Sequence, residues 1–511
     1  MCAEAVEARG VCAESVAAAV EARRVRGERR GSRSFCGKNM GASFGPRKRG
    51  AWLPLLAALA VASADDGFRA ADEIRSLPGW SQALPSKQYS GSIALADGSG
   101  IRYWLVVGEG DWERKPLVLW VQGGPGGSSL EGMWTENMGP FAVAADGALE
   151  RSASGGWSTE ATMLFWEMPA GVGFSTCAAR GCPKYDDTKF EAQATEFFCE
   201  FFAAFPALAP LDFFMTGESY GGVYVPLAAL GFIEAGCAAA APKLVGALIG
   251  NGCTGTAIGP CGPGRAANTF DQLADRAMVA PATAERVRGA CPEGFLGADD
   301  ACKRALRAAS AEAGRYDTYD VMDGCAQNMT LVKFVCDETP NASWACAFGD
   351  GPAAPRLASG ADCGVGARTA AYLSRADVQD AIHVPRVAGK PVVWGARDIH
   401  YARTAADLLT PSRRSYPRLV EKLDRVLIYS GDADGQVPWR GTEAWTRGLG
   451  YETARPWRPW ALSTGEVAGS VVAYERNFTF ATVRNAGHMV PTYKPDAALA
   501  LLRRFLRGHE I

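Results

Sequence analysis

The chain has few histidines: only His383, His400, His488 and His509 occur among its 511 residues. A mechanism that needs an imidazole base therefore has few candidates. No Lys/Arg stripe with interleaved aromatic residues recurs, so the sequence does not indicate nucleic-acid binding. There is also no internal repeat and no low-complexity linker. With 48% hydrophobic residues, the chain is expected to be globular.

A run long enough to cross a membrane is missing at the amino end. The apolar segment Ala51–Val61 holds about a dozen residues, whereas spanning takes roughly 20. It follows the basic segment 46–50 and precedes Ala62-Ser63-Ala64, an order typical of a cleaved secretory signal. We predict a leader over residues 1–64 and no stable membrane insertion after cleavage. The net charge of −2 then divides into +6 for this leader and −8 for the rest.

Twelve of the fifteen cysteines follow the leader, an even number that favours disulfides in an oxidising compartment. Cys177 and Cys182 could close a small loop, and most of the others crowd between residues 253 and 363. Their spacing forms no paired CxxC or Cys/His set, which disfavours zinc. We expect a secreted, vacuolar or lysosomal protein. Three glycosylation sequons agree with that route, at Asn328, Asn341 and Asn477.

Several apolar runs indicate buried central strands. They cover residues 117–121, 162–166, 212–215 and 244–249, after a predicted hairpin over 88–107. Helical patterns over 190–205 and 220–234 alternate with them. Further elements are expected at 375–383 (helix), 425–429, 471–475 and 478–483 (strands) and 495–506 (helix). This alternation predicts an α/β fold with a mixed, mostly parallel sheet and covering helices.

A Cys-, Gly- and Ala-rich region interrupts this alternation. It contains helical pieces but no clear buried strand, and we interpret it as an inserted, disulfide-rich cap over residues 252–370. The core is then divided into residues 65–251 and 371–511.

The strongest motif is Gly217-Glu218-Ser219-Tyr220-Gly221, which stands between an apolar strand pattern and a helical one. This context is typical of a nucleophile elbow, where glycines relieve crowding around an exposed serine. We therefore predict that Ser219 is a catalytic nucleophile.

The serine needs a base, and the base needs an acid to orient it. His488 follows a strand in a turn suited to presenting its ring at the sheet edge, unlike the other three histidines. The acid should stand between serine and histidine in the chain, as in α/β-hydrolases. Asp432 and Asp434 both follow the strand at 425–429, and the sequence mechanics do not choose between them.

These motifs together resemble the serine carboxypeptidase family. The resemblance covers roughly residues 70–507 and includes Gln122–Ser129, Glu136, Gly217–Gly222, Gly431–Asp434 and Gly487–Pro491. It implies the α/β-hydrolase fold and makes Asp434 the triad acid, with Asp432 a structural turn residue.

The resemblance also implies roles for other residues. Gly124 and Tyr220 would donate main-chain N–H groups to the oxyanion. Glu136 and Glu218 would share a proton and bind the substrate's terminal carboxylate, because two touching carboxylates cannot both ionise cheaply. The remaining residues implied in substrate binding are Gln122, Gly123, Val437 and Met489.

Two positions depart from the family pattern. Gln122 stands where the family usually has Asn, so its amide reaches one methylene further. Gly127 stands where the family often has Cys, so a disulfide from this loop should be absent and other contacts must hold it.

The expected reaction is removal of C-terminal residues from peptides and proteins through an acyl-enzyme, favoured at acidic pH, with no metal or organic cofactor. An acyltransferase using the same triad is the nearest alternative, and a protective or binding partner on this fold is a second. The substrates would be peptide or protein C-termini, with no nucleic acid involved; a homodimer remains open.

Overall fold

The computed structural model describes residues 67–236, 241–254, 259–262, 264–295, 298–322, 329–331, 365–395, 399–402 and 415–511. The predicted leader 1–64 and the sequons at Asn328 and Asn341 lie outside the described residues. Among the residues described, no helix has both the length and the apolar character that a bilayer crossing requires.

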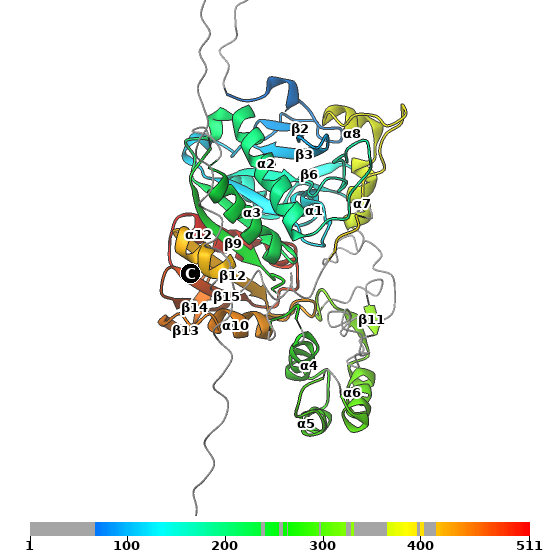
Figure 1. Ribbon diagram of the computed structural model, residues 1–511, viewed down its shortest axis with the longest axis vertical. Coiled ribbons are helices and arrows are strands. Elements are labelled where there is room, and N and C mark those ends of the chain that lie inside the picture. Colours follow the sequence, from blue (N-terminus) through cyan, green and yellow to red (C-terminus); the bar gives the residue numbers. More distant parts are fainter. Residues whose placement is uncertain are drawn as a thin grey trace, which may run out of the picture. The chain divides into compact units, whose positions relative to one another are not determined.

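An eleven-stranded sheet forms the centre of the fold (Figure 1). Its strand order is β1-β2-β3-β7-β4-β8-β9-β12-β15-β14-β13. In that order the strands span Glu73–Ile74, Gln88–Ala94, Gly100–Val106, Thr162–Trp166, Leu117–Val121, Phe213–Glu218, Leu244–Gly250, Arg425–Gly431, Phe478–Val483, Val467–Tyr474 and Thr453–Ala461.

The six strands from β7 to β15 in this order run parallel, and antiparallel strands flank them on both sides. Every residue of β4, β7, β8 and β9 is buried, because helices cover both faces of the parallel part. The segments that follow parallel strands therefore emerge at one edge, where α/β proteins usually place their sites.

Two apolar cores lie on opposite faces of this sheet. One contains side chains from α2 (Asp187–Ala204), α3 (Gly221–Ala235), the helical residues 415–422 and Trp445 of α10 (Trp439–Arg447). The other contains side chains from α1 (Ser129–Thr135), α7 (Val365–Leu373), α8 (Ala376–Ala381) and α12 (Pro495–Leu506). The result is a helix–sheet–helix arrangement.

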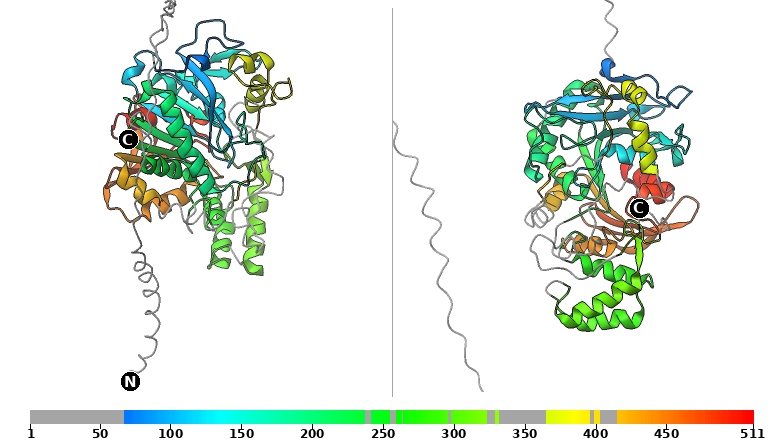
Figure 2. Two further views of the ribbon diagram at one scale, coloured as in Figure 1. Left: turned by 45° about the horizontal axis from the view of Figure 1, so that its top comes forward. Right: turned by 90° about the vertical axis from the view of Figure 1, so that its right-hand side faces the viewer.

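Three helices between β9 and β12 form their own small core. They are α4 (Arg265–Asp275), α5 (Pro281–Ala290) and α6 (Asp300–Ala313), drawn in green beneath the sheet in both views of Figure 2. A short antiparallel pair follows, β10 (Arg315–Asp317) and β11 (Met329–Leu331). The sequence pattern did not indicate this strand pair.

Three disulfides join described cysteines: Cys177–Cys182, Cys253–Cys261 and Cys291–Cys302. The first closes the small loop that the spacing predicted. The other two brace the region after β9, in agreement with a disulfide-rich insertion.

The α/β-hydrolase fold predicted from the sequence is confirmed, with a mixed, mostly parallel sheet. The strands predicted at 117–121, 162–166 and 478–483 and the helix at 495–506 have the predicted bounds. The helix predicted at 375–383 is shorter, because α8 ends at Ala381 and His383 has a left-handed backbone with φ 58°.

Candidate active site

Ser219 occupies the sharp turn between β8 and α3. Its backbone is left-handed, with φ 60°, a conformation that non-glycine residues rarely adopt outside functional turns. Its N–H donates to the Gly250 carbonyl at 3.2 Å, and its carbonyl accepts from the Cys253 N–H at 2.7 Å. The turn is therefore held by the last residue of β9 and by the chain that follows it.

The loop after β4, residues 123–127, which we call the glycine loop, passes directly over this turn. A Cβ added to Gly123 would lie 2.4 Å from the Tyr220 nitrogen and 2.6 Å from Ser219 Cβ. Gly124 has φ 111°, which an L side chain rarely adopts. Glycine is thus required for the close approach that brings the main chains of the loop and of Tyr220 together, as the two expected oxyanion donors need.

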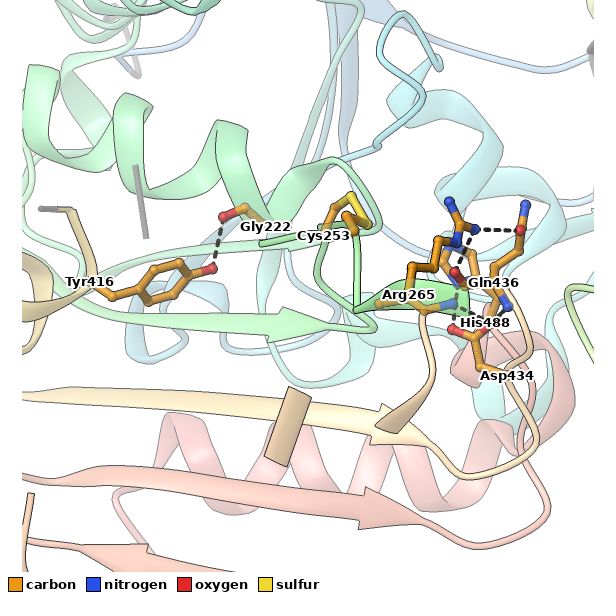
Figure 3. Close-up of a disulfide and its surroundings, with 9 residues drawn as sticks. Gly222, Cys253, Arg265, Tyr416, Asp434, Gln436 and His488 are labelled. Atoms are coloured by element: carbon orange, nitrogen blue, oxygen red, sulfur yellow. Dashed lines mark hydrogen bonds and ion pairs between the residues drawn. A yellow bond between two sulfur atoms is a disulfide. The ribbon is translucent and has the colours of Figure 1, made fainter. Parts of the chain in front are cut away.

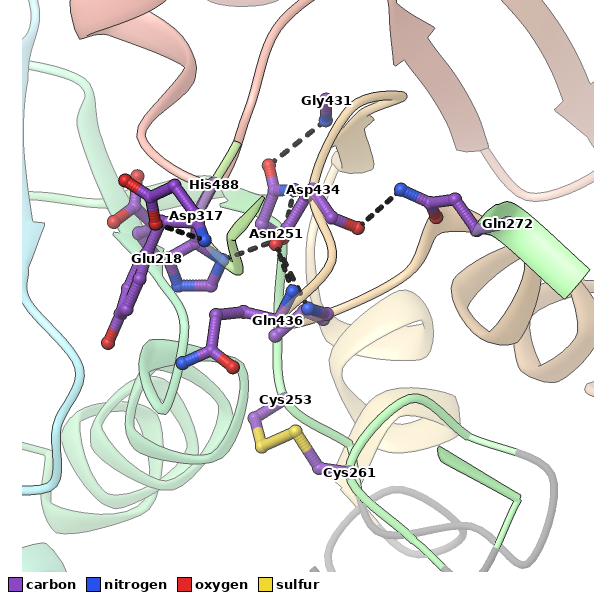
Figure 4. Close-up of polar contacts among 12 residues, drawn as sticks. Glu218, Asn251, Cys253, Cys261, Gln272, Asp317, Gly431, Asp434, Gln436 and His488 are labelled. Carbon is purple, nitrogen blue, oxygen red and sulfur yellow. Dashed lines mark hydrogen bonds and ion pairs between the residues drawn. A yellow bond between two sulfur atoms is a disulfide. The ribbon is translucent and has the colours of Figure 1, made fainter. Parts of the chain in front are cut away.

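His488 and Asp434 are in direct contact. His488 Nδ1 lies 2.6 Å from Asp434 Oδ2, and both residues are buried (Figures 3 and 4). The other Asp434 oxygen accepts the N–H groups of Gln436, at 2.7 Å, and Val437, at 3.1 Å. A carboxylate held in this way orients the imidazole ring of a histidine, so that the other ring nitrogen can act as a base.

Asp432 lies elsewhere, although only one residue separates it from Asp434. Its Oδ1 accepts from the side chain of Arg276, the residue after α4, at 2.8 Å and from the main-chain N–H of Asn485 at 2.7 Å. These contacts brace the turns around His488 without reaching its ring. The structure thus brings Asp434, rather than Asp432, to the histidine, which is the choice that the sequence mechanics left open.

Asn251 is a residue of the site that the sequence analysis missed. Its amide nitrogen donates to Asp434 Oδ2 at 2.6 Å, and its amide oxygen accepts the Gly431 N–H at 3.1 Å (Figure 4). The side chain is fully buried, and the backbone has φ 42°. The only signal in the sequence was an Asn-Gly pair after a strand, which is common in ordinary turns.

The segment after β10 reaches the histidine and was also missed. The Tyr319 carbonyl accepts the main-chain N–H of His488 at 2.6 Å. The Tyr319 ring meets the imidazole edge to face, with ring centroids 5.1 Å apart. Val321 donates its N–H to the Ala433 carbonyl. Residues 319–321 therefore pack against both turns that carry the histidine and the acid.

The Glu136–Glu218 pair forms with the help of Gln122. Gln122 Nε2 donates to Glu136 Oε1 at 3.1 Å and to Glu218 Oε1 at 3.3 Å. Its Oε1 accepts the Trp120 indole N–H at 2.7 Å, which fixes the amide's orientation. The extra methylene of Gln122 is thus accommodated with both ends of the amide satisfied.

The two glutamates are also within hydrogen-bonding reach of each other, and both are buried. Glu136 Oε2 and Glu218 Oε2 have no partner among the described N–H and O–H groups. A hydrogen bond between two carboxyl groups requires that one carries a proton.

Burial raises the pKa of both carboxyl groups. Loss of hydration raises the pKa of Glu136 to about 7, and burial followed by the charge of Glu136 raises the pKa of Glu218 well above its usual value. Glu131 stands nearby on α1, and burial together with the charge of Glu136 raises its pKa to about 8. The pair therefore holds a proton in mild acid.

The loop that has Gly127 in place of cysteine is held by polar contacts. The Ser128 hydroxyl donates to Glu167 Oε1 at 2.6 Å, and the Ser129 hydroxyl accepts the Gln122 N–H at 3.1 Å. Glu167 also accepts the Trp394 indole N–H and the Phe174 N–H. This network supplies the restraint that the sequence required from other contacts.

The remaining expected residues are also placed. Val437 and Met489 are buried beside the acid and the histidine, respectively. Asn477 is exposed in the turn between β14 and β15. His383 contacts the Glu73 carbonyl, and His400 and His509 are exposed, so these three histidines lie apart from the site.

The sequence profile of the serine carboxypeptidase family matches residues 78–508. The chain belongs to the serine carboxypeptidase family. The predicted enzyme class, a serine-type carboxypeptidase, is thereby confirmed.

Curated relatives and a solved structure agree with this membership. Serine carboxypeptidase 1 of Hordeum vulgare is 29% identical over 476 residues, covering 86% of this chain and 93% of the relative. Serine carboxypeptidase-like 21 of Arabidopsis thaliana is 29% identical over 478 residues, covering 86% and 94%. The crystal structure of Kex1, a prohormone-processing carboxypeptidase from Saccharomyces cerevisiae, superposes with a TM-score of 0.59 at 20% identity, covering 83% of this chain and 91% of that one.

Proposed function

We propose that Ser219, His488 and Asp434 act as the catalytic triad of this serine carboxypeptidase. Ser219 attacks the last peptide carbonyl while His488 accepts its proton and later delivers it to the leaving amine. Water then releases the shortened peptide from the acyl-enzyme. The 2.6 Å contact between His488 Nδ1 and Asp434 Oδ2 carries this assignment, because a carboxylate on Nδ1 orients the ring of a histidine base.

Main-chain N–H groups of Gly124 and Tyr220 stabilise the oxyanion in this mechanism. Their support is the close approach of the Gly123 backbone to Ser219 and Tyr220. Such donors contribute a rate factor of roughly 100 to 1000 each.

The Glu136–Glu218 pair makes the enzyme an exopeptidase. With its proton in place, the pair donates a hydrogen bond to the substrate's terminal carboxylate. Gln122, which contacts both glutamates, and Gly123, which lies against Ser219 and the Glu218 carbonyl, are proposed to bind the same end of the substrate. Val437 and Met489 are proposed to line the pocket for the departing residue. The support is the raised pKa of both glutamates, which keeps the pair protonated in mild acid.

The secretory route is part of this proposal. A cleaved signal within residues 1–64, glycosylation at Asn328, Asn341 and Asn477, and a secreted, vacuolar or lysosomal location fit together with the disulfides. The exposed position of Asn477 in a turn supports its use as an acceptor.

The proposed activity is tested with N-blocked dipeptides and their C-terminal amides across pH 4 to 8. We expect release of the last amino acid from the free acids and much slower release from the amides. Ser219→Ala should abolish both turnover and labelling by a serine-directed phosphonate. Labelling that persists in this variant would overturn the nucleophile, and transfer of an acyl group from a glucose ester to an alcohol, in preference to hydrolysis, would favour the acyltransferase.

A further inference from the structure

Asp187 joins the residue after the nucleophile to a distant part of the chain. It stands at the start of α2, with its side chain buried. Its Oδ1 accepts the Tyr401 hydroxyl at 2.7 Å and the Tyr220 hydroxyl at 3.2 Å. One carboxylate oxygen therefore connects Tyr220, which carries a proposed oxyanion donor, to Tyr401.

Tyr401 belongs to a short segment, Ile399–Ala402, which we call the strap. The strap pairs with Tyr185: the Tyr185 N–H donates to the His400 carbonyl at 2.8 Å, and the Ala402 N–H donates to the Tyr185 carbonyl at 2.7 Å. The Tyr401 ring also meets the Tyr220 ring edge to face at 5.6 Å. Main-chain and side-chain contacts thus anchor this end of the strap beside the nucleophile turn.

The other end of the strap holds the glycine loop. A Cβ added to Gly126 would lie 2.7 Å from Ile399 Cγ1, so this side chain rests directly on the loop. Ile399 also contacts Gly171, which packs on the Cys177–Cys182 disulfide. Since Gly127 provides no disulfide for the loop, this packing is one of the contacts that restrain it.

We propose that the strap and Asp187 set the spacing between the two oxyanion donors, Gly124 and Tyr220. The donors come from different elements, the loop after β4 and the beginning of α3, and the strap contacts both. Asp187 and Tyr401 are positioning residues, since they act through Tyr220. This inference rests on the proposed function, because it assumes that these N–H groups bind the oxyanion.

Correct spacing matters because oxyanion donors work at about 2.7–3.1 Å from the developing charge. A small displacement weakens the transition state more than the bound substrate, whose carbonyl oxygen carries less charge. Disturbing the strap should therefore lower kcat and leave KM nearly unchanged.

Tyr401→Phe removes the hydroxyl and retains the ring that packs on Tyr220. We expect kcat for a blocked dipeptide to fall about tenfold, the effect of a lost hydrogen bond to a charged group, with KM changed by less than about twofold. Asp187→Asn keeps an acceptor oxygen without the charge and should reduce kcat less.

A second readout reports the oxyanion directly. An N-blocked amino aldehyde adds to Ser219, whose proton passes to His488, and the hemiacetal oxygen takes the oxyanion's position. We expect Tyr401→Phe to weaken binding of this aldehyde by the same factor that it lowers kcat/KM. A merely structural role would leave the affinity unchanged in the folded variant.

The chain offers a matched control in Tyr103, whose buried hydroxyl donates to the buried Asp72 carboxylate far from Ser219 in the sequence. Tyr103→Phe loses the same kind of contact and should lower stability without lowering kcat. If Tyr401→Phe behaves like Tyr103→Phe in kcat and aldehyde affinity, the positioning role is wrong. A wild-type protein that does not hydrolyse blocked dipeptides would instead overturn the proposed function.

Discussion

Asn251 donates its side-chain amide to the same carboxyl oxygen of Asp434 that contacts His488. Asn251 follows β9, whereas Asp434 follows β12, and these strands are parallel neighbours in the sheet. The Gly431 N–H holds the amide oxygen, so the NH2 group must face the carboxylate. The acid is thus oriented by three partners besides the histidine: this amide and the N–H groups of Gln436 and Val437.

Asn251→Asp should lower kcat by roughly 100-fold, because a second carboxylate beside Asp434 would repel it and disturb the imidazole's orientation. Asn477→Asp is the control, since Asn477 also has a left-handed backbone but is exposed in a turn. Steady-state kinetics on a blocked dipeptide, with a melting curve for each variant, measure the effect. An Asn251→Asp enzyme that is as active as the control would remove this residue from the site.

Asp434→Asn should lower kcat by about 10,000-fold, because the histidine would lose the carboxylate that fixes its tautomer. Asp432→Asn should cost less than about tenfold, since Asp432 contacts Arg276 and the Asn485 N–H rather than the imidazole. The measurement is kcat of both variants and of the wild type on the same blocked dipeptide at a single pH. Equal losses would show that the contact with His488 does not decide the assignment.

Peptide hydrolysis should decline with rising pH once the Glu136–Glu218 pair has lost its last proton. Burial raises the pKa of Glu136 to about 7, and burial followed by the charge of Glu136 raises the pKa of Glu218 well above its usual value, so Glu218 keeps the shared proton after Glu136 has ionised. When Glu218 ionises as well, two negative charges repel the substrate carboxylate. An ester substrate with the same acyl group and a blocked carboxyl end should decline less. The measurement is kcat/KM against pH for both substrates, and superimposed profiles would contradict the proton-sharing pair.

The same pair should make the protein more stable in mild acid. The folded pKa of Glu136 lies above the ordinary value of 4.5, so this group binds more protons in the folded than in the unfolded state between about pH 4.5 and 7. The contribution is complete below about pH 4.5 and is lost as the pH rises through 7.

Denaturant midpoints at pH 5 and pH 7.5 measure this difference. Glu136→Gln should flatten the dependence, because a neutral amide takes up no proton. Glu466→Gln, at an exposed position, should leave it as in the wild type. A wild-type midpoint that rises from pH 5 to pH 7.5 in step with the control, and is unaffected by Glu136→Gln, would falsify this origin of the stability.

Ser219 and His488 could be predicted from the sequence because their local patterns are distinctive. The serine has a glycine-flanked turn between strand and helix, and the histidine had few competitors. The sequence pattern could not show whether Asp432 or Asp434 contacts the histidine, because both follow β12. The conformation of the turn decides which carboxylate meets the ring. Asn251 and Tyr319 left no usable signal, because their contacts join parts of the chain far apart in sequence.

The fold was predictable where strands are buried on both faces and form continuous apolar runs, as in β4 and β7. β13 was missed because it is the exposed outer strand of the sheet. Its residues include Arg455, Pro456, Arg458 and Pro459, which a central strand would not tolerate. An edge strand accepts prolines because one side of its backbone needs no partner.

The order of the strands also has a consequence for how the enzyme is made. β8 and the Ser219 turn are complete after fewer than half of the residues have been synthesised, whereas Asp434 and His488 follow β12 and β15 near the end of the chain. β12 adds to the sheet beside β9, and β15 adds beside β12. A growing polypeptide on the ribosome therefore carries the proposed nucleophile before the proposed base and acid have been made. The proposed triad can assemble only after almost the whole chain has been synthesised.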